Sequence, residues 1–517
     1  MSSKEVPATV HQETEFAPAN ERAKAHGQLG AAHLFIEDSV GNVTGRVLIP
    51  RPTDDPKDPL TWTRTRKEIA FWSISYFIFL SNYTVASISP GLVAIQEHFE
   101  VTGSYASYFI TMPVLFIGIG NLFWIPLSRK IGKRPVLILS SLTFFLSCLW
   151  SAVAKSGGSM LGSRIIQGFG ASCPDAMGPA VVADLFFVHE RGQKLGWYTL
   201  VIAFGNSFGA IFAGLITNAT PNWRWIFWMD AIVTGVLFLL MVFAMPETNF
   251  ERPTATEMGE TEDLAPVLTQ EKRSHLSYVQ SLKVTSFYDK KTSLLKHFWR
   301  PLTLTVYPAV WYAGLTQGVG VGWVILQQTA NSIFYPALYN YSGLAVGNIN
   351  VANIISACIA CLYGGIGSDM LVAWITKRRG GYFQPEYRLW GALPIFPFVP
   401  LSLMLWGCAL YYKLDPFVGI AGFGITYGVL CAISPIALTY LVDCYRPLAG
   451  ETLTIATAIK NVFAFGICFA VVPWIQKDGF IKVSGYSTLI EGLIFVSTIP
   501  LYIYGERIRN WTSKLSI

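Results

Sequence analysis

Charged residues are scarce in this chain of 517 residues, and their scarcity defines its class. Only 14% of the residues are charged, against about 25% in an average soluble domain. Hydrophobic residues make up 52% of the sequence, and the mean hydropathy of the whole chain is +0.42. A chain of this length and composition indicates many membrane spans rather than a single anchor, and it argues against a soluble globular protein.

The sequence also lacks the motifs of common catalytic and cofactor sites. No GxxxxGK[ST] loop is present, so nothing is predicted to bind the phosphates of ATP. HExxH does not occur, and the seven histidines include no pair with metal-ligand spacing. The eight cysteines lie in or beside apolar segments, with no paired CxxC clusters that would indicate zinc and no disulfide framework. We therefore predict no enzyme, no cofactor and no metal site.

Apolar stretches long enough to cross a bilayer dominate what is present, since a spanning helix needs about 20 residues. Twelve such stretches are found, at 67–90, 103–127, 135–154, 161–187, 195–217, 225–245, 301–326, 344–368, 388–411, 416–442, 453–475 and 483–505. We predict an all-α membrane protein with twelve transmembrane helices in two six-helix bundles. The predicted parts are a disordered cytosolic tail (1–66), an N-terminal bundle (67–246), a cytosolic loop (247–299), a C-terminal bundle (300–505) and a cytosolic tail (506–517).

Basic residues concentrate in alternate connecting loops, which explains the net charge of +6 without a nucleic-acid partner. These residues are Arg129, Lys130, Lys133, Arg134, Arg191, Lys194, Lys377, Arg378, Arg379, Arg507, Arg509 and Lys514. The intervening loops are nearly free of them. The positive-inside rule then places both termini and the central loop in the cytosol. We expect a monomeric multi-pass protein of the plasma membrane.

The predicted fourth span carries two opposite charges. Gly162–Phe187 contains Arg164 and Asp175, which a continuous helix would place about 20° apart around its axis and about 16 Å apart along it. A charge at mid-bilayer costs at least about 2.5 kcal/mol. This face is therefore expected to line a water-filled cavity or to meet a partner. The alternative is a structural pair that only holds helices together.

Proton coupling requires a buried group that can lose and regain a proton. Asp175 is the candidate, because we judge it the only acid deep within a span. Four other acids are placed at helix ends, where solvent or loop partners explain them: Asp184, Asp230, Asp369 and Asp443. Arg164 cannot release its proton, so it would either tune a neighbouring carboxylate or donate hydrogen bonds to backbone across a helix interface.

Other polar residues within the predicted spans are candidates for a substrate cavity. They are Asn82, Asn206, Trp311, Gln317, Asn353, Lys460 and Asn461. Buried amides are costly unless paired, so they suit either a wet cavity or hydrogen bonds between helices. For Lys460, a structural partner on a neighbouring helix and a role with substrate are equal alternatives. The glycine run from Gly314 to Gly322 is either a flexing point or a close helix contact.

Several motifs resemble those of the major facilitator superfamily, and within it the fungal twelve-span drug:proton antiporters. They are DPLTWTRTRK (Asp58–Lys67), GKRPV (Gly132–Val136), RIIQGFGAS (Arg164–Ser172), MPET (Met245–Thr248), RRGGYFQPEYRL (Arg378–Leu389) and YLVDCY (Tyr440–Tyr445). The resemblance extends over residues 54–504. It implies a proton-coupling role for Arg164. It also implies conformational-switch loops that contain Gly132, Arg134, Gly365, Asp369 and Arg378.

The chain departs from the family pattern at two places. The first conserved loop usually has GxxxD, but here Ile125 and Arg129 occupy those positions, while the second half keeps Gly365 and Asp369. The acid to which the family's charge relay is attributed is therefore missing from the first half. In the fifth span, Asn206 stands where the antiporter motif has proline, so this helix is expected to bend less.

These observations together predict a secondary active transporter that moves a small organic solute by alternating access. The leading interpretation is proton-coupled export of a drug-like or secondary metabolite. One alternative is proton-coupled transport of polyamines or other organic cations. Another is a nutrient sensor that does not transport, although the residues after Tyr504 are too few for a signalling tail. The expected partners are the solute, protons and the lipid bilayer, with no nucleic acid.

Overall fold

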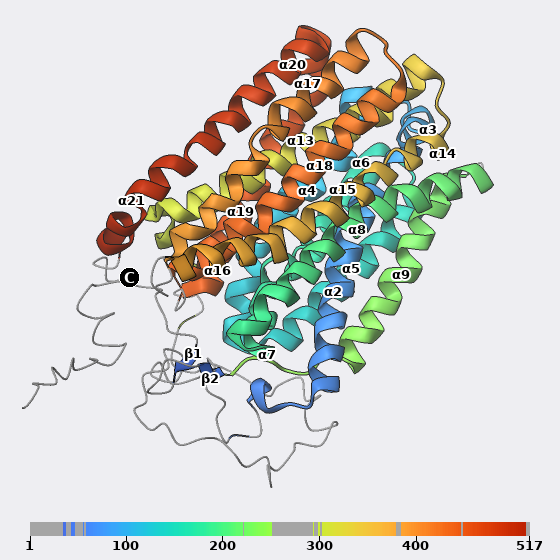
Figure 1. Ribbon diagram of the computed structural model, residues 1–517. Helices are drawn as coiled ribbons and strands as arrows, with labels where there is room; N and C mark the ends of the chain where they lie inside the picture. The colour runs from blue at the N-terminus through green and yellow to red at the C-terminus, as the bar shows by residue number, and fades with distance from the viewer. Residues whose placement is uncertain are drawn as a thin grey trace, which may run out of the picture.

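Helices form nearly all of the regular structure in the computed structural model of this chain (Figure 1). The structure describes residues 35–37, 43–46, 55, 58–220, 222–250, 293, 298–299, 302–378, 384–445 and 448–512. Strands β1 (Phe35–Glu37) and β2 (Val43–Arg46) pair antiparallel outside the helical body. Most of the predicted N-terminal tail and central loop lies outside the described residues, as do residues 513–517.

The first half of the chain contributes the helices up to residue 243. They are η1 (Pro59–Thr61), α2 (Arg64–Ala86), η2 (Ser89–Gly91), α3 (Leu92–His98), α4 (Gly103–Ile131), α5 (Lys133–Val153), α6 (Gly157–Ala171), α7 (Cys173–Leu185), α8 (Val188–Ala219) and α9 (Arg224–Phe243). Their buried apolar side chains, such as Phe77 stacked on Phe144, form the core of this bundle.

The second half forms the other bundle. Its helices are η3 (Leu304–Val306), α13 (Pro308–Tyr339), α14 (Gly343–Asn348), α15 (Val351–Leu362), η4 (Tyr363–Gly367), α16 (Ser368–Arg378), η5 (Pro385–Ile395), α17 (Phe398–Tyr411), α18 (Pro416–Cys444), α19 (Ala449–Phe469), α20 (Val471–Val496) and α21 (Thr498–Thr512). Buried aromatic side chains such as Trp323 and Trp406 fill its core. Large apolar side chains, including Leu493 and Ile232, are exposed on the outside of the bundles, as a surface facing lipid requires.

The predicted fourth span is not one continuous helix, and this is the main correction to the sequence prediction. Within the described residues, eleven helices are long and apolar enough to cross a membrane. The remaining span is divided into α6 and α7 at Ser172. Pro174 lies in the first turn of α7 and has no N–H to continue the hydrogen bonds of α6. Arg164 and Asp175 therefore lie on two separate helices.

The break leaves backbone carbonyls that need other donors, because the membrane interior offers no bulk water. Side chains of three neighbouring helices supply these hydrogen bonds. Trp124 of α4 donates to Phe169 O at 2.9 Å, Ser140 of α5 to Gly170 O at 2.6 Å and Ser81 of α2 to Ala171 O at 2.9 Å. The bundle thus stabilises the break from three sides.

Glycines let α6 approach its neighbours closely around this break. A Cβ added at Gly168 would lie 2.4 Å from the carbonyl oxygen of Pro113 on α4. One added at Gly170 would lie 2.6 Å from the backbone nitrogen of Phe144 on α5. Both distances are to backbone atoms, so a methyl group could be accommodated only by moving a helix.

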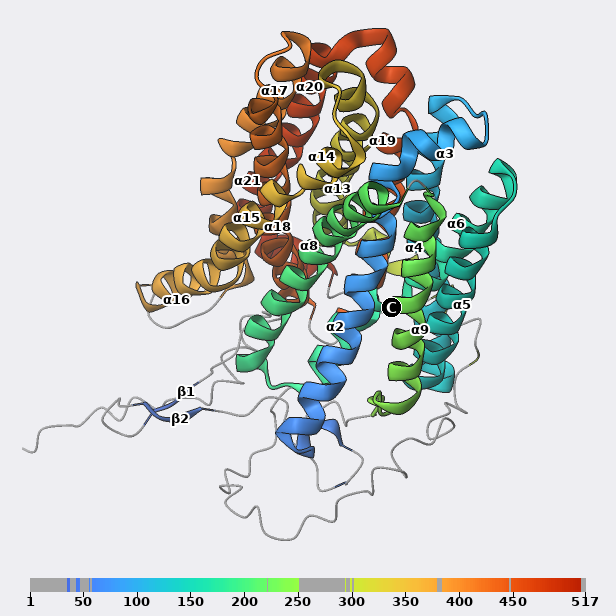
Figure 2. The same cartoon turned by 90° about the vertical axis from the view of Figure 1, so that its right-hand side faces the viewer.

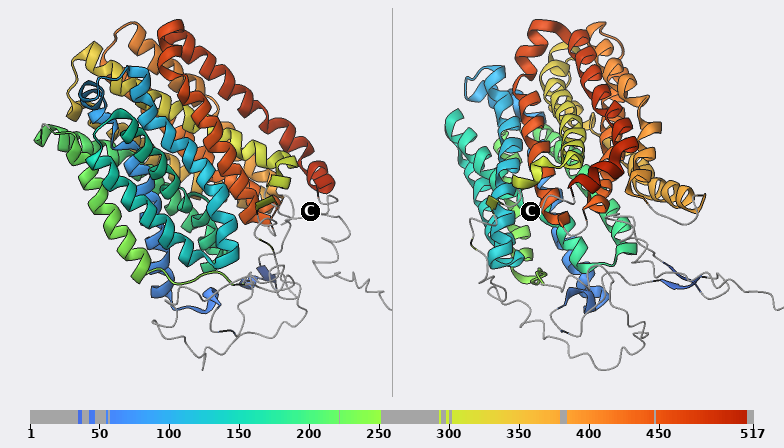
Figure 3. Two further views of the ribbon diagram at one scale, coloured as in Figure 1. Left: turned by 180° about the vertical axis from the view of Figure 1, so that it is seen from behind. Right: turned by 90° about the vertical axis from the view of Figure 1, so that its left-hand side faces the viewer.

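The two bundles meet closely at one end of the molecule. There α8 lies beside α14 (Figure 2), and a Cβ added at Gly347 would lie 2.7 Å from Ala210 O. On the other side of the interface, α4 and α19 lie side by side in the view from behind (Figure 3). Tyr108 and Phe469 stack there with ring centroids 5.1 Å apart. At the opposite end of the same two helices, Arg129 forms an ion pair with Glu451.

We predict that Gly168→Ala lowers the thermal stability of the purified protein, since overpacking of this kind costs about 1–3 kcal/mol. Gly158→Ala is the matched control, because it lies on the same helix and a Cβ there has nothing within 4 Å. Thermal unfolding in detergent measures both variants. The control should be neutral or slightly stabilised, as alanine favours helix. Equal midpoints for both variants would show that the close approach of α6 to α4 is not required.

Candidate functional site

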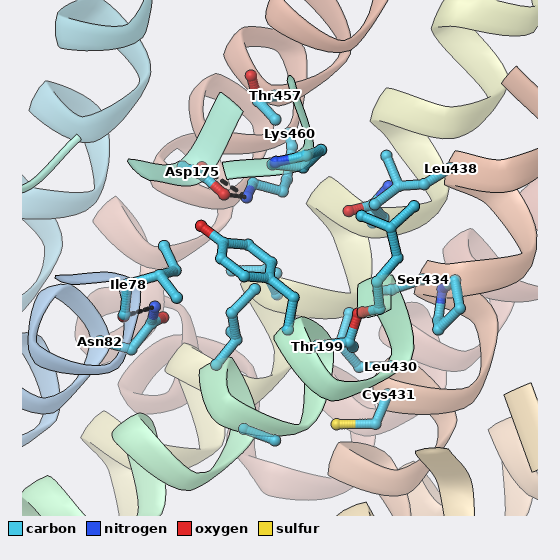
Figure 4. Close-up of a pocket in the computed structure, with 18 of the residues that line it drawn as sticks. Ile78, Asn82, Asp175, Thr199, Leu430, Cys431, Ser434, Leu438, Thr457 and Lys460 are labelled. Atoms are coloured by element: carbon cyan, nitrogen blue, oxygen red, sulfur yellow. Dashed lines mark hydrogen bonds and ion pairs between the residues drawn. The ribbon is translucent and has the colours of Figure 1, made fainter. Parts of the chain in front are cut away.

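A cavity lies between the two bundles, with an empty volume of about 1670 Å³ that includes space open to solvent (Figure 4). Its walls come from α2, α4, α7 and α8 of the first half and from α13, η4, α16, η5, α18 and α19 of the second. It extends to Leu195, Asp369, Arg388 and Val442, near the helix ends that carry the basic loops. The cavity therefore reaches the side that the positive-inside rule predicts to be cytosolic.

An ion pair joins the two bundles inside this cavity. Lys460 Nζ of α19 lies 2.8 Å from each carboxylate oxygen of Asp175 on α7, and Figure 4 shows both side chains in the wall. Asn461 Nδ2 donates to Asp175 Oδ2 at 3.2 Å. The two charged side chains are only 14% and 12% exposed. At this depth each charge needs the other, because neither is surrounded by enough water to be stable alone.

Glycines on two flanking helices place α19 where Lys460 can reach Asp175. A Cβ added at Gly318 of α13 would lie 2.8 Å from the carbonyl oxygen of Lys460. One added at Gly118 of α4 would lie 2.8 Å from the Cβ of Asn461. Of the two readings of the glycine run in α13, close helix contact is therefore the one seen in this conformation.

Three further predicted candidates line the same cavity: Asn82, Asn206 and Gln317. The amide of Asn82 donates to Ile78 O within its own helix at 2.9 Å. The side chain of Asn206 lies beside the hydroxyl of Tyr427 in the same wall. The fifth predicted span is the unbroken helix α8 in the structure.

The remaining two cavity candidates lie elsewhere. Trp311 is 40% exposed, and its indole N–H donates to Thr305 O at 2.7 Å. Asn353 is fully buried and donates to Asn350 Oδ1 at 3.2 Å. Neither is among the residues that line the cavity, so the structure does not bring them to the ion pair.

The first predicted switch loop contains a tight turn held by buried polar contacts. Gly132 has φ 99° between α4 and α5, a conformation that glycine adopts without strain. Arg134 is buried and donates to Val242 O at 2.6 Å. The backbone N–H groups of Lys133 and Arg134 donate to the carboxylate of Glu247 at 3.0 and 3.1 Å. Burial raises the pKa of Glu247, and these hydrogen bonds only partly oppose the shift.

The second predicted switch region combines a widened helical turn with a charge cluster. Gly365 lies in the π-helical turn η4, and Asp369 follows in α16. Arg388 of η5 donates to Asp369 at 2.9 Å and to Asp443 of α18 at 2.5 Å. The guanidinium of Arg378 lies 3.9 Å from the ring centroid of Trp374.

Arg164 is fully buried and is not among the residues that line the cavity. Its guanidinium donates to Phe109 O at 2.8 Å, to Thr84 O at 3.0 Å and to Gln167 Oε1 at 2.7 Å. These contacts match the expectation that it donates hydrogen bonds to backbone across a helix interface. The prediction that one continuous helix carries Arg164 and Asp175 is wrong, and of the two only Asp175 lines the cavity.

The prediction that Asp175 is the only deep acid is wrong. Asp230 lies inside α9 and is 0% exposed, and Glu491 lies inside α20 and is 4% exposed. Both stand within stretches already predicted to cross the membrane. Glu491 could have been found by testing every predicted span for acids. Asp230 was assigned to a helix end by distance along the sequence alone, which ignores burial by neighbouring helices.

Comparison with known proteins decides the family. Residues 72–499 match the model of the Major Facilitator Superfamily. The chain belongs to this superfamily of transporters. The predicted family is thereby confirmed, as is the prediction that the protein is not an enzyme.

Relatives and a solved structure agree with this assignment. An uncharacterized superfamily transporter of Schizosaccharomyces pombe is 29% identical, with 90% of this chain and 89% of the relative covered. The efflux pump radE of Floropilus chiversii is 24% identical, with coverage of 88% and 84%. The proton:xylose symporter XylE has the same fold, with a TM-score of 0.60 and 15% identity over 86% of this chain and 96% of XylE.

We predict that Lys460→Met lowers thermal stability more than the double change Asp175→Asn with Lys460→Met. The single change leaves a buried carboxylate without its cation, which costs about 3–5 kcal/mol, whereas the double change leaves no charge. Lys482→Met is the control, since Lys482 is exposed. Thermal unfolding of the purified variants measures the difference. If the thermal stability of the double variant is no higher than that of Lys460→Met alone, the unpaired carboxylate of Asp175 is not the cause of the loss, and the ion pair is not what stabilises Lys460 in the cavity.

Proposed function

We propose that this transporter is a proton-coupled carrier of a small organic solute that works by alternating access, with Asp175 and Lys460 at its centre. The observation that supports this proposal most strongly is the ion pair of Asp175 and Lys460, which links the two bundles inside the cavity. The assignments of the other cavity residues and of the bundle limits 67–246 and 300–505 are part of the same proposal.

The coupling follows from competition for one carboxylate. In this conformation Lys460 neutralises Asp175. A proton on Asp175, or a cationic group of the solute beside it, would take the place of Lys460 and release the link between the bundles. Losing Lys460 without a replacement costs about 3–5 kcal/mol. The empty carrier therefore keeps the pair, and the carboxylate exchanges one positive partner for another.

The cavity lining favours an amphipathic solute. Most of the walls are apolar, with Val114, Val324 and Leu430 among them, and the amides of Asn206 and Gln317 add a few hydrogen-bonding groups. Such a lining suits a drug-like or secondary metabolite. The relative named as an efflux pump supports export as the direction. The carboxylate of Asp175 lines the cavity and is partly exposed, so it could also bind a cationic group. Polyamines or other organic cations are therefore the alternative substrates.

We predict that Asp175→Asn abolishes proton-driven accumulation, because the amide cannot exchange a proton for a cation. Proteoliposomes with an imposed pH gradient would be tested with three probes: ethidium, spermidine and a neutral azole. Glu97→Gln is the matched control, an exposed acid-to-amide change outside the cavity. The wild type and the control should accumulate at least one probe, and Asp175→Asn none. Accumulation by Asp175→Asn equal to that of the wild type would falsify the role of Asp175.

The alternating basic loops support a second part of the proposal, the orientation with both termini in the cytosol, and we propose the plasma membrane as the location. Tags at residue 1, near Glu260 and at residue 517 should be inaccessible to antibody on intact cells. They should become accessible after permeabilisation. Labelling of any one of them from outside intact cells would contradict the proposed orientation.

A further inference from the structure

A second buried carboxylate lies in the first bundle, away from the cavity. Asp230 of α9 is 0% exposed, and it is not among the residues that line the cavity. Its Oδ2 accepts a hydrogen bond from Ser87 Oγ at 2.9 Å. Its Oδ1 is also buried and has no hydrogen-bond partner within the described residues. One hydroxyl is a sparse environment for a permanent carboxylate, which is normally surrounded by several donors when buried.

Ser87 has one hydrogen but two acceptors. Its hydroxyl lies 2.9 Å from Asp230 Oδ2 and 3.2 Å from Thr84 O. When Asp230 is ionised, Ser87 donates to it. When Asp230 carries a proton on Oδ2, the acid donates to Ser87 Oγ and the serine hydrogen turns to Thr84 O. Oδ2 therefore has a hydrogen-bond partner in both protonation states after rotation of one hydroxyl, with no movement of heavy atoms.

The charged and titratable groups that face Asp230 come from three helices. Tyr83 of α2, Cys148 of α5 and Arg164 of α6 each interact with it electrostatically. Arg164 and Asp230, both in the described part of the chain, form no ion pair within 4.0 Å. The guanidinium instead donates to Thr84 O at 3.0 Å, the carbonyl that is also the second acceptor of Ser87. Arg164 thus stabilises the ionised acid at a distance without fixing it in that state.

We propose that Asp230 is a second proton-binding site, in which Ser87 serves both the ionised and the protonated acid. A hydronium ion transfers its proton to Oδ2, so an O–H bond forms on the acid while one O–H bond of the hydronium breaks and water is left. The hydroxyl of Ser87 redirects its hydrogen, and no other covalent bond changes. Asp230 lies six residues into α9 from Arg224, or roughly 9 Å along the helix. That end of α9 is opposite the loops that the cavity reaches. Asp230 is thus placed toward the side of the molecule opposite to the one that the cavity of Asp175 reaches.

The link to transport rests on the proposed proton coupling, but proton binding itself can be tested without any solute. Infrared difference spectra of the purified full-length protein, recorded between mildly acidic and mildly alkaline pH, report protonated carboxyl groups through their C=O stretch. The wild type should show a carboxyl component that disappears as pH rises, and Asp230→Asn should lack it. Ser87→Ala should keep the component but shift its frequency, because the acid loses its acceptor.

Thr234→Val is the matched control, since Thr234 Oγ1 donates to the backbone carbonyl of Asp230 and not to its carboxylate. Its spectrum should equal that of the wild type. If Asp230→Asn changes nothing in the difference spectrum, Asp230 keeps one protonation state and is only a fixed counter-charge for Arg164, which overturns the proposal. An unshifted component in Ser87→Ala also overturns it, and this variant remains informative if Asp230→Asn does not fold. Neither result depends on the transport assay of Asp175→Asn, so the two proposals can fail separately.

Discussion

The requirement to neutralise charge inside the membrane connects the main features of this structure. Asp175 is acceptable in the cavity because Lys460 reaches it from the other bundle at 2.8 Å. Lys460 can do so because α19 packs closely on two glycines. Gly318 of α13 lies against the backbone of Lys460, and Gly118 of α4 lies against Asn461. This charge pair is a structural contact between the bundles. In the proposed mechanism, a change of partner at Asp175 would alter the contact between the two halves of the transporter.

The broken fourth span follows from a similar requirement for the backbone. Pro174 interrupts the helix, and the freed carbonyls persist only because Trp124, Ser140 and Ser81 donate to them. Arg164 lies before the break and is buried in the first bundle, whereas Asp175 lies after the break and lines the cavity.

Much of this arrangement could be predicted from sequence, because membrane spans are long, apolar and regularly interrupted. The helix positions, the two bundles and the cavity position of Asn82, Asn206, Gln317 and Asn461 followed from span limits and polar exceptions within them. The break at Ser172 could not be predicted in the same way. It depends on donors from α2, α4 and α5 that are distant in sequence. Trp311 and Asn353 were misplaced because helical periodicity shows that a residue is polar and deep, but not which neighbouring helix it meets.

The burial of Asp230 shows why distance from a helix end is a poor guide to solvation in a bundle. Asp230 lies only six residues from the start of α9, yet the packing of α2 and α5 against α9 excludes solvent and leaves Ser87 as the one hydroxyl donor to its carboxylate among the described residues. In its ionised form Asp230 interacts with Arg164 of the first bundle, whereas Asp175 is paired with Lys460 of the second. In the proposed mechanism the two acids therefore bind protons at separate places, and a change of partner at Asp175 does not require a change at Asp230.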